Sequence, residues 1–558
     1  MKASDLFVRC LESEGVDYIF GIPGEENADM MMSLLTSKIQ FILTRHEQSA
    51  AFMADVYGRL TKKVGVCLAT LGPGATNLTT GIANANMDRS KVLAITGQTS
   101  VNSLHKESHQ NMDVITMFKP ITKWNWSIRS TDSIPEVIRR SFKISLEEKV
   151  GATHIELPQD IAKMNSDILP ITPTETLRSP ANMFLIKKAV QLILNSKKPL
   201  ILVGNGCIRE NATFYVRKLV ELTGICSMNT FMAKGVISDK SPRHLQTIGI
   251  KEADHALLAM KEADLVIAIG YDLVEYSPKF WNHSLDKKIL HIDFTPAETD
   301  TYYPPTVEIA ADIELSIDLI LSELEKEKQR DPGITCFPFR DIPELFKKIK
   351  TEVSHKISEY KEDTSYPIKP EKLVTTVRKI LGYRDIVLSD FGVHKLWISK
   401  IYNTYFPNTC IIPNGFCSMG FSLPGAIAAQ IVHPEKNIVS MCGDGAFLMN
   451  VQELETAVRL KLPIIIVVWV DEEYGLIALK QKMEFGKTGF TKFSNPDFVK
   501  LAESFGATGF KVNSTKEFEH IFEKATHATG GPIVIAVNVD YSRNAILLND
   551  EYCDLPGK

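Results

Sequence analysis

The sequence predicts an α/β protein of three domains, each built on a mostly parallel sheet flanked by helices. Short apolar runs that end in glycine turns alternate with amphipathic stretches, and two breaks in composition divide the chain into three parts of similar size. The clearest apolar runs are residues 64–70, 92–96, 200–203, 265–269 and 438–442. Continuous apolar strands that alternate with helices are typical of parallel sheets covered on both faces. Ligands of such sheets bind beyond the carboxyl ends of the strands, so we expect the glycine turns to carry the chemistry.

Length and composition exclude several classes of protein. The chain has 558 residues, with 63 Lys and Arg against 67 Asp and Glu, and its formal charge is −4. Because there is no basic excess, general binding of nucleic acid is not expected. A hydrophobic content of 44% argues against disorder. The longest apolar run, residues 462–470, is about half as long as a membrane helix needs, so no membrane span is expected.

The N-terminus and the cysteines favour a cytoplasmic location. The first residues lack the continuous apolar core of a signal peptide, which indicates a mature N-terminus. The nine cysteines are dispersed and form no Cys-x-x-Cys pair. This distribution argues against zinc and redox-pair sites and is typical of reduced thiols.

Two segments are interpreted as linkers between domains. Residues 164–182 are rich in Pro, Ser and Thr, and the charge run over residues 323–332 leads into a polar segment that ends near Pro370. We therefore expect an N-terminal, a central and a C-terminal domain, followed by a polar tail. Their predicted bounds are residues 1–165, 185–325, 370–540 and 541–558.

The strongest motif lies in the C-terminal domain. Gly443-Asp444-Gly445 follows one apolar strand, and a second strand, residues 464–470, ends at Asp471, which lies 27 residues after Asp444. If these parallel strands are adjacent, the two carboxylates lie side by side. Carboxylate oxygens, together with phosphate oxygens, are suitable ligands for octahedral Mg²⁺. The glycine turns let backbone N–H groups approach a diphosphate. The alternative is two unrelated turns with solvated acids.

This motif resembles the cofactor motif of the thiamine-diphosphate (ThDP) decarboxylase and carboligase superfamily, in which Gly-Asp-Gly is followed at a similar distance by Asn or Asp. The resemblance implies the ThDP-binding fold of the pyruvate decarboxylase and acetolactate synthase type. It makes Asp444 and Asp471 side-chain ligands of Mg²⁺, with Glu473 as a ligand through its backbone carbonyl. The other cofactor-binding residues that it implies in this domain are Gly392, His394, Met419, Gly443, Gly445, Ala446, Tyr474 and Gly475.

The N-terminal domain carries segments that resemble the other half of the family's site. Pro23 lies in Gly-Ile-Pro-Gly, and Glu47 ends Thr-Arg-His-Glu. By this resemblance Glu47 is the catalytic glutamate, whose bond to N1′ of the aminopyrimidine favours the imino form that removes the C2 proton. The turn at residues 71–77 lacks the lysine of a phosphate loop. The resemblance places its Pro73 and Asn77 beside the aminopyrimidine, with a helix cap as the alternative role for Asn77.

The resemblance covers almost the whole chain and implies a reaction. Residues 263–282 resemble the catabolic acetolactate synthases, which lack FAD, so FAD is not expected although Gly204-Asn205-Gly206 is typical of dinucleotide sites. Gln110, in a segment that resembles the same enzymes, would face the substrate. The implied reaction decarboxylates pyruvate on ThDP and condenses the hydroxyethyl unit with a second pyruvate or a related 2-keto acid. Its products are 2-acetolactate and CO₂.

Two departures from the family pattern leave the substrate open. Lys480 stands where biosynthetic members have Trp and catabolic ones Gln, so it is either a ligand of the acceptor carboxylate or a solvated helical lysine. Phe416-Cys417 replaces a pair of glutamines. A non-condensing 2-keto acid decarboxylase is disfavoured because His105 and His109 are not adjacent. A different ThDP carboligase is a further alternative, whereas an inactive scaffold is disfavoured because Glu47, Asp444 and Asp471 are intact.

The resemblance also implies an assembly. Family members form the active site between subunits, so a homodimer is the minimum active unit, and a homotetramer is expected. The partners are then other copies of the chain and small 2-keto acid substrates.

Overall fold

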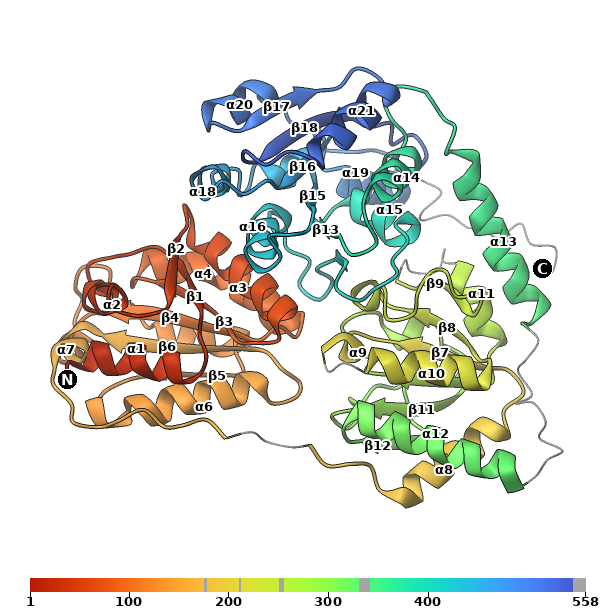
Figure 1. The fold of residues 1–558 in the computed structure, drawn as a ribbon, viewed down its shortest axis with the longest axis horizontal. Coiled ribbons are helices and arrows are strands. Elements are labelled where there is room, and N and C mark those ends of the chain that lie inside the picture. The colour runs from red at the N-terminus through yellow and green to blue at the C-terminus, as the bar shows by residue number, and fades with distance from the viewer. Residues whose placement is uncertain (175–177, 210–211, 250–254, 331–341, 545–558) are drawn as a thin grey trace.

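The computed structural model describes residues 1–174, 178–209, 212–249, 255–330 and 342–544, without the side chains of residues 255–256 and 352–357. It contains three six-stranded sheets, and all strand pairs in them are parallel. Figure 1 shows them as three bodies, with the first on the left, the second at the lower right and the third at the top. The predicted fold class is confirmed.

The first sheet has the order β2-β1-β3-β4-β6-β5. Its strands are β1 (Tyr18–Gly21), β2 (Gln40–Leu43), β3 (Gly65–Ala69), β4 (Val92–Gln98), β5 (Trp124–Ser127) and β6 (Ala152–Pro158). Its helices are α1 (Ala3–Ser13), α2 (Ala28–Leu34), α3 (Glu47–Thr61), α4 (Pro73–Met87), α5 (Val114–Phe118), α6 (Ile134–Leu146) and α7 (Gln159–Lys163). Strands β3, β4 and β6 are buried along their whole length, as central strands of a covered sheet must be.

The second sheet has the order β12-β11-β10-β7-β8-β9. Its strands are β7 (Pro199–Val203), β8 (Cys226–Asn229), β9 (His244–Thr247), β10 (Leu265–Ile269), β11 (Lys288–Asp293) and β12 (Val307–Ala310). Its helices are α8 (Met183–Leu194), α9 (Gly206–Arg209), α10 (Thr213–Thr223), α11 (His255–Glu262) and α12 (Ile313–Arg330). The helix α13 (Glu344–Glu359) then leads to the third body.

The third sheet has the order β14-β13-β15-β16-β18-β17. Its strands are β13 (Ile386–Ser389), β14 (Cys410–Ile411), β15 (Ile438–Gly443), β16 (Ile465–Val470), β17 (Thr508–Lys511) and β18 (Ile533–Asn538). Its helices are α14 (Pro370–Ile380), α15 (Val393–Ile401), α16 (Ser422–Val432), α17 (Asp444–Phe447), α18 (Glu453–Arg459), α19 (Gly475–Phe485), α20 (Phe498–Ser504) and α21 (Thr515–Ala525).

The first and third bodies share one hydrophobic core. Helix α3 packs on α16, and the rings of Phe52 and Phe421 meet edge to face at 5.5 Å. Arg59, also on α3, forms ion pairs with Asp55 at 2.6 Å and with Asp88 at 2.8 Å. Asp88 in turn accepts a hydrogen bond of 2.5 Å from the backbone N–H of Gly415. Helix α3, which begins at Glu47, is therefore rigidly attached to the third body.

One segment that was interpreted as a linker is largely helical. The charge run over residues 323–332 begins inside α12, which continues to Arg330, and α13 occupies much of the polar segment after it. Ile317, Ile320, Leu321 and Leu324 form a buried stripe on α12, because their spacing places them on one helix face. Most of the charged side chains lie on the other faces of the helix. Because they are so numerous in the sequence, the apolar spacing was not recognised as helical.

No helix within the described ranges combines the length and the hydropathy that are needed to cross a membrane.

Candidate active site

The two carboxylates that the sequence singles out lie at the same edge of the third sheet. Strands β15 and β16 are parallel neighbours, with Gly443 opposite Trp469. Asp444 begins α17 directly after β15, and Asp471 directly follows β16. The expected adjacency of the two strands is therefore observed, and it follows from the apolar runs that precede each acid.

Asp444 is buried, and both of its carboxylate oxygens accept hydrogen bonds. Its Oδ1 accepts from the backbone N–H of Gly445 at 2.8 Å. Its Oδ2 accepts from the backbone N–H groups of Asp471 at 3.1 Å and Glu472 at 2.8 Å. The same oxygen accepts from Asn495 Nδ2 at 2.7 Å. These donors fix the carboxylate, and Asn495 is a member of the site that sequence reasoning missed.

The carboxyl group of Asp471 lies in an electrostatic environment that disfavours its charged form. Burial, followed by the negative charge of Asp444, raises the pKa of Asp471 to about 8. Two carboxylates that repel each other at a partly buried site are stabilised by a divalent cation between them. In the described part of the chain, no group of three or more His, Cys, Asp or Glu side chains is arranged to hold a metal. Further ligands at this edge would be backbone oxygens, such as that of Glu473, amide side-chain oxygens, or oxygens of a bound group.

One cavity collects all the cofactor and metal residues that were predicted in the C-terminal domain. Its walls come from the ends of β13, β15 and β16 and the starts of α15, α17 and α19. The predicted residues among them are Gly392, His394, Met419, Gly443, Asp444, Gly445, Ala446, Asp471, Glu473, Tyr474 and Gly475. Phe391, Leu476 and Tyr541 also line the cavity and were not predicted.

His394 presents an unsatisfied nitrogen in this region. Burial lowers the pKa of His394 to about 3, so the imidazole is neutral at physiological pH. Its Nε2 is buried and has no hydrogen-bond partner among the described residues. A Cβ atom at Gly392 would lie 2.7 Å from the ring, so glycine is required there for the backbone to pass the imidazole. A buried polar atom without a partner fits a site that is completed by a bound group.

Glu47 lies at a corresponding edge of the first sheet. It is the first residue of α3 and its side chain is buried. Asn77 Nδ2, on α4, donates a hydrogen bond of 2.9 Å to Glu47 Oε2. Asn77 therefore orients the Glu47 carboxylate instead of capping a helix.

Three further predicted residues lie at turns near this edge. Pro73 is the first residue of α4 and follows Gly72, whose φ of 51° favours glycine. A Cβ atom at Gly72 would meet the backbone oxygen of Gln110 at 2.8 Å, so Gln110 lies against the start of α4. Pro23 follows β1 in the turn that holds Gly24. Pro23, Pro73 and Gln110 are exposed.

Within one chain the two halves of the predicted site remain separate. None of the predicted N-terminal residues lines the cavity at Asp444 and Asp471. The start of α3 is instead held by α18, because Glu453 Oε1 accepts from the backbone N–H groups of Arg45 and His46, both at 3.0 Å. Ser49 Oγ donates to Asn450 Oδ1 at 3.0 Å, and Asn450 Nδ2 donates to the carbonyl of Gly420 at 2.7 Å.

Lys480 lies on α19, as predicted, but outside the walls of the cavity. Its side chain is exposed. Burial raises the pKa of the Cys417 thiol, and the positive charges of Lys395 and Lys480 oppose this shift. Lys480 therefore lies close enough to act on Cys417, two residues before Met419.

Comparisons with known proteins identify the family of the chain. Models of the thiamine pyrophosphate enzymes match the chain in three parts: the N-terminal TPP binding domain at residues 1–117, the central domain at 186–320 and the C-terminal TPP binding domain at 390–537.

Curated proteins match over nearly the full length. The acetolactate synthase of Bacillus subtilis is 36% identical over 99% of this chain and 95% of its own length. The catabolic acetolactate synthase of Raoultella terrigena is 32% identical over 98% of this chain and 96% of its own. A probable acetolactate synthase large subunit of Methanococcus aeolicus is 32% identical over 94% of this chain and 90% of its own. The chain therefore belongs to the thiamine pyrophosphate enzyme family, within the group that contains the acetolactate synthases.

Proposed function

We propose that the protein is a ThDP-dependent acetolactate synthase that joins two 2-keto acid molecules with loss of CO₂. The observation that carries this proposal is the pair of strand-end carboxylates, Asp444 and Asp471, in one cavity with every other predicted cofactor residue of the C-terminal domain. The full-length similarity to acetolactate synthases supports the choice of reaction within the family.

The cavity residues fit the charged end of the cofactor. Asp444, Asp471 and the backbone carbonyl of Glu473 would hold Mg²⁺, which prefers hard oxygen ligands and substrate phosphates. Gly443 and Gly445 line the cavity where a diphosphate would approach the backbone, and His394 Nε2 offers a hydrogen bond. Met419 would pack against the cofactor as an adaptable apolar surface.

Glu47 would act at the other end of the cofactor. Asn77 holds Oε2, which leaves Oε1 to share a proton with a ring nitrogen. When bound, ThDP supplies the carbanion and the electron sink that decarboxylation of a 2-keto acid requires. The protein's own contribution is to fix the Glu47 carboxylate, keep the cavity dry and position both substrates. Gln110 and Lys480 would contact the substrates from opposite halves of the site.

We infer that a second copy of the chain completes the site. The cavity at Asp444 contains no residue of the first body, whereas Glu47 and Asn77 lie at a separate edge. A homodimer that brings the Glu47 edge of one subunit to the Asp444 cavity of the other would make two equal sites. The same proposal includes a homotetramer, a cytoplasmic location and a site without FAD.

Product analysis tests the function. Purified protein is incubated with pyruvate, ThDP and Mg²⁺, with and without 2-ketobutyrate as a competing acceptor. We expect 2-acetolactate and CO₂, with the mixed product when 2-ketobutyrate is present. Acetaldehyde as the main product would instead identify a simple decarboxylase, and no turnover with ThDP bound would identify an inactive scaffold.

A further inference from the structure

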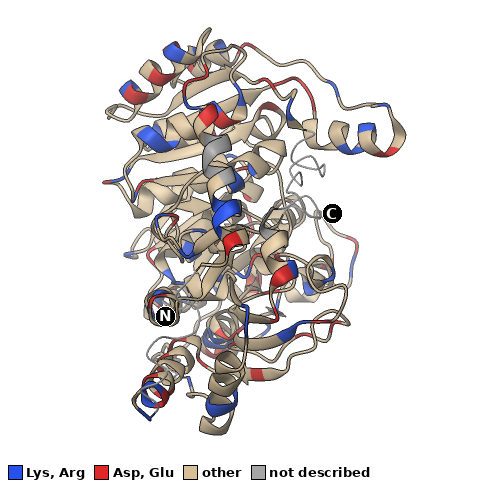
Figure 2. Cartoon of the chain, turned by 90° about the vertical axis from the view of Figure 1, so that its right-hand side faces the viewer, with Lys and Arg blue, Asp and Glu red and all other residues tan. Residues whose placement is uncertain are grey.

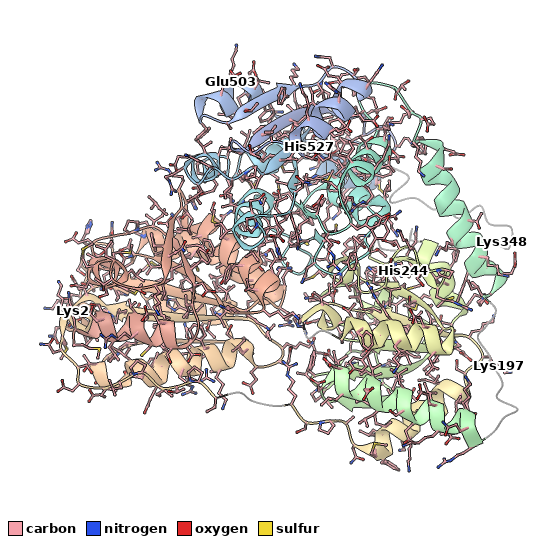
Figure 3. The ribbon with its side chains drawn as sticks, viewed as in Figure 1. Lys2, Lys197, His244, Lys348, Glu503 and His527 are labelled. Atoms are coloured by element: carbon pink, nitrogen blue, oxygen red, sulfur yellow. The ribbon has the colours of Figure 1, made fainter. Side chains whose placement is uncertain are left out.

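A second large cavity lies between the second and third bodies. Its volume is about 670 Å³, and it is lined by β9, α13, α14 and α15 with the loops beside them. Among the described residues, it shares no lining residue with the cavity at Asp444. His244, which lines it, is labelled at this junction in Figure 3. Helix α13 runs along this side of the molecule, which faces the viewer in Figure 2.

The second cavity is positively charged in a protein that is negative as a whole. Seven of its described lining residues are Lys or Arg and three are Asp or Glu, whereas the formal charge of the chain is −4. A cleft lined by charges of one sign concentrates ions of the opposite sign. The distribution therefore favours an anionic ligand.

Two of the cations in the cavity are buried without an ion pair among the described residues. Arg378 donates to neutral oxygens only, at 2.7 Å to Tyr402 Oη, 2.5 Å to the carbonyl of Leu381 and 2.6 Å to that of Gly382. Lys234 is 3% exposed and donates to the carbonyl of Ser399 at 3.0 Å. Asp239 lies close enough for the charge of Lys234 to help lower its pKa. Arg378 has no such carboxylate partner in the described part of the chain, and burying a charge without a counterion is costly. An anion in the cavity would offset that cost.

His244 adds an unsatisfied polar atom to the same wall. The side chain is buried, and its Nε2 lies 3.3 Å from Asp239 Oδ1. Its Nδ1 is buried and makes no hydrogen bond within the described part of the chain. Such an atom is normally satisfied by water or by a ligand.

An aromatic surface at the rim provides the second element of recognition. Tyr383 is 53% exposed, and its ring centroid lies 4.6 Å from that of Tyr405, which also lines the cavity. Lys240 Nζ lies 4.1 Å from the Tyr383 centroid, so a base would stack beside this ammonium on the exposed part of the ring. Exposed aromatic rings stack on planar bases. The volume lies within the range of about 300–1,000 Å³ that is typical of small-molecule sites, and it exceeds the space that a single phosphate fills.

We propose that this cavity binds a nucleoside diphosphate or triphosphate, with the phosphates at Arg378, Lys234 and Lys372 and the base on Tyr383. The site is separate from the proposed cofactor cavity and does not depend on the reaction performed there.

Calorimetric titration of the full-length protein with ADP tests this proposal. ThDP and Mg²⁺ are present in excess, so that ADP does not enter the cofactor cavity. We expect one ADP per chain, with an affinity that falls as salt concentration rises. Adenosine, which lacks the phosphates, and orthophosphate, which lacks the base, should each bind at least about tenfold more weakly. Absence of ADP binding at millimolar concentration, or equal binding of orthophosphate, would overturn the proposal.

Substitutions in the lining of the second cavity test whether ADP binds there. The double substitution Lys361→Gln/Lys372→Gln removes two cations of the lining and should weaken ADP binding at least about tenfold. Tyr383→Ala should weaken ADP binding and leave the weak binding of orthophosphate unchanged. Lys187→Gln/Lys197→Gln makes the same charge change at exposed positions outside the lining and should bind ADP as the wild type does. Equal weakening in both double variants would show a general charge effect and contradict the site.

Discussion

Asn77 Nδ2 donates a 2.9 Å hydrogen bond to Glu47 Oε2, so that the start of α4 holds the carboxylate at the start of α3. One carboxylate oxygen is thereby fixed, and the other remains available at the edge of the first sheet. A group that is oriented before its ligand arrives loses little entropy when the ligand binds. This contact supports the proposal that the first body receives the ring of the cofactor.

Removal of the Glu47 charge should stop catalysis without unfolding the protein. In Glu47→Gln the side chain keeps its shape but cannot share a proton with a ring nitrogen. We expect the rate of acetolactate formation to fall by about 10²- to 10⁴-fold, which is the usual contribution of a positioned acid or base. Steady-state rates and the affinity for ThDP are measured together.

The matched control for that variant is Asn77→Ala, which removes the orienting donor and leaves the acid in place. The Asn77→Ala substitution should lower the rate of acetolactate formation by less than about tenfold. An active Glu47→Gln enzyme, or an Asn77→Ala variant as damaged as Glu47→Gln, would contradict the role of the carboxylate.

Replacement by asparagine should weaken Mg²⁺-dependent ThDP binding more at Asp444 than at Asp471. Asp444 accepts hydrogen bonds from four N–H donors, and an amide NH₂ in Asp444→Asn would face some of them. Asp471→Asn keeps an oxygen ligand and removes a carboxylate whose pKa is raised by burial and then by repulsion from Asp444. We expect the Mg²⁺ concentration for half-maximal ThDP retention to rise at least about tenfold in Asp444→Asn and only about threefold in Asp471→Asn. The reverse order would exclude this arrangement of ligands.

Lys480 should affect substrate binding more than turnover. If it holds the carboxylate of the acceptor, Lys480→Gln raises the apparent KM for pyruvate about five- to tenfold and changes kcat little. Lys482, also exposed, lies two residues further along α19 and therefore points away from Lys480. Lys482→Gln is the control and should match the wild type. An unchanged KM in Lys480→Gln would identify Lys480 as a solvated helical lysine.

His154 should make the first body acid-sensitive. Burial lowers the pKa of His154 to about 3, whereas an unfolded histidine titrates near 6.5. Below pH 6.5 the unfolded state therefore binds a proton that the folded state does not. The stability that His154 contributes is complete above about pH 6.5 and is lost as the pH falls towards 3.

At pH 5.5 this loss amounts to about 1.4 kcal/mol. Thermal midpoints are measured at pH 7.5 and 5.5 for the wild type and for His154→Gln, and the variant should lose less on acidification. His527→Gln replaces an exposed histidine and should follow the wild type. If the two variants show the same pH dependence, His154 does not titrate as its burial requires.

The strand-end chemistry could be predicted because it is local in the sequence. Asp444 and Asp471 each follow an apolar strand directly, and parallel neighbours end at the same edge of a sheet. Glu47 and Asn77 were found through the family resemblance, but their direct hydrogen bond was not. The spacing of these two residues does not show whether Asn77 donates a hydrogen bond to the Glu47 carboxylate or caps a helix.

The missed residues reach the site from distant parts of the chain. Asn495 donates to Asp444 from a loop 51 residues away, and its sequence context contains no motif. Tyr541 lines the cavity because its ring stacks on Trp469 at 6.2 Å, and Trp397 Nε1 donates to Asn544 Oδ1 at 2.8 Å. The start of the predicted tail thus packs on the third body, while residues 545–558 lie outside the described residues. Such contacts depend on tertiary packing, which local patterns do not encode.

The central claim is that Glu47 of one subunit and Asp444 of another serve the same site. Mixing Glu47→Ala and Asp444→Ala chains under conditions of subunit exchange tests it most directly. A mixed dimer then contains one intact site and one doubly altered site, so equal mixing should restore about a quarter of the wild-type activity. If each chain instead builds its own complete site, every site in the mixture carries one substitution and no activity returns.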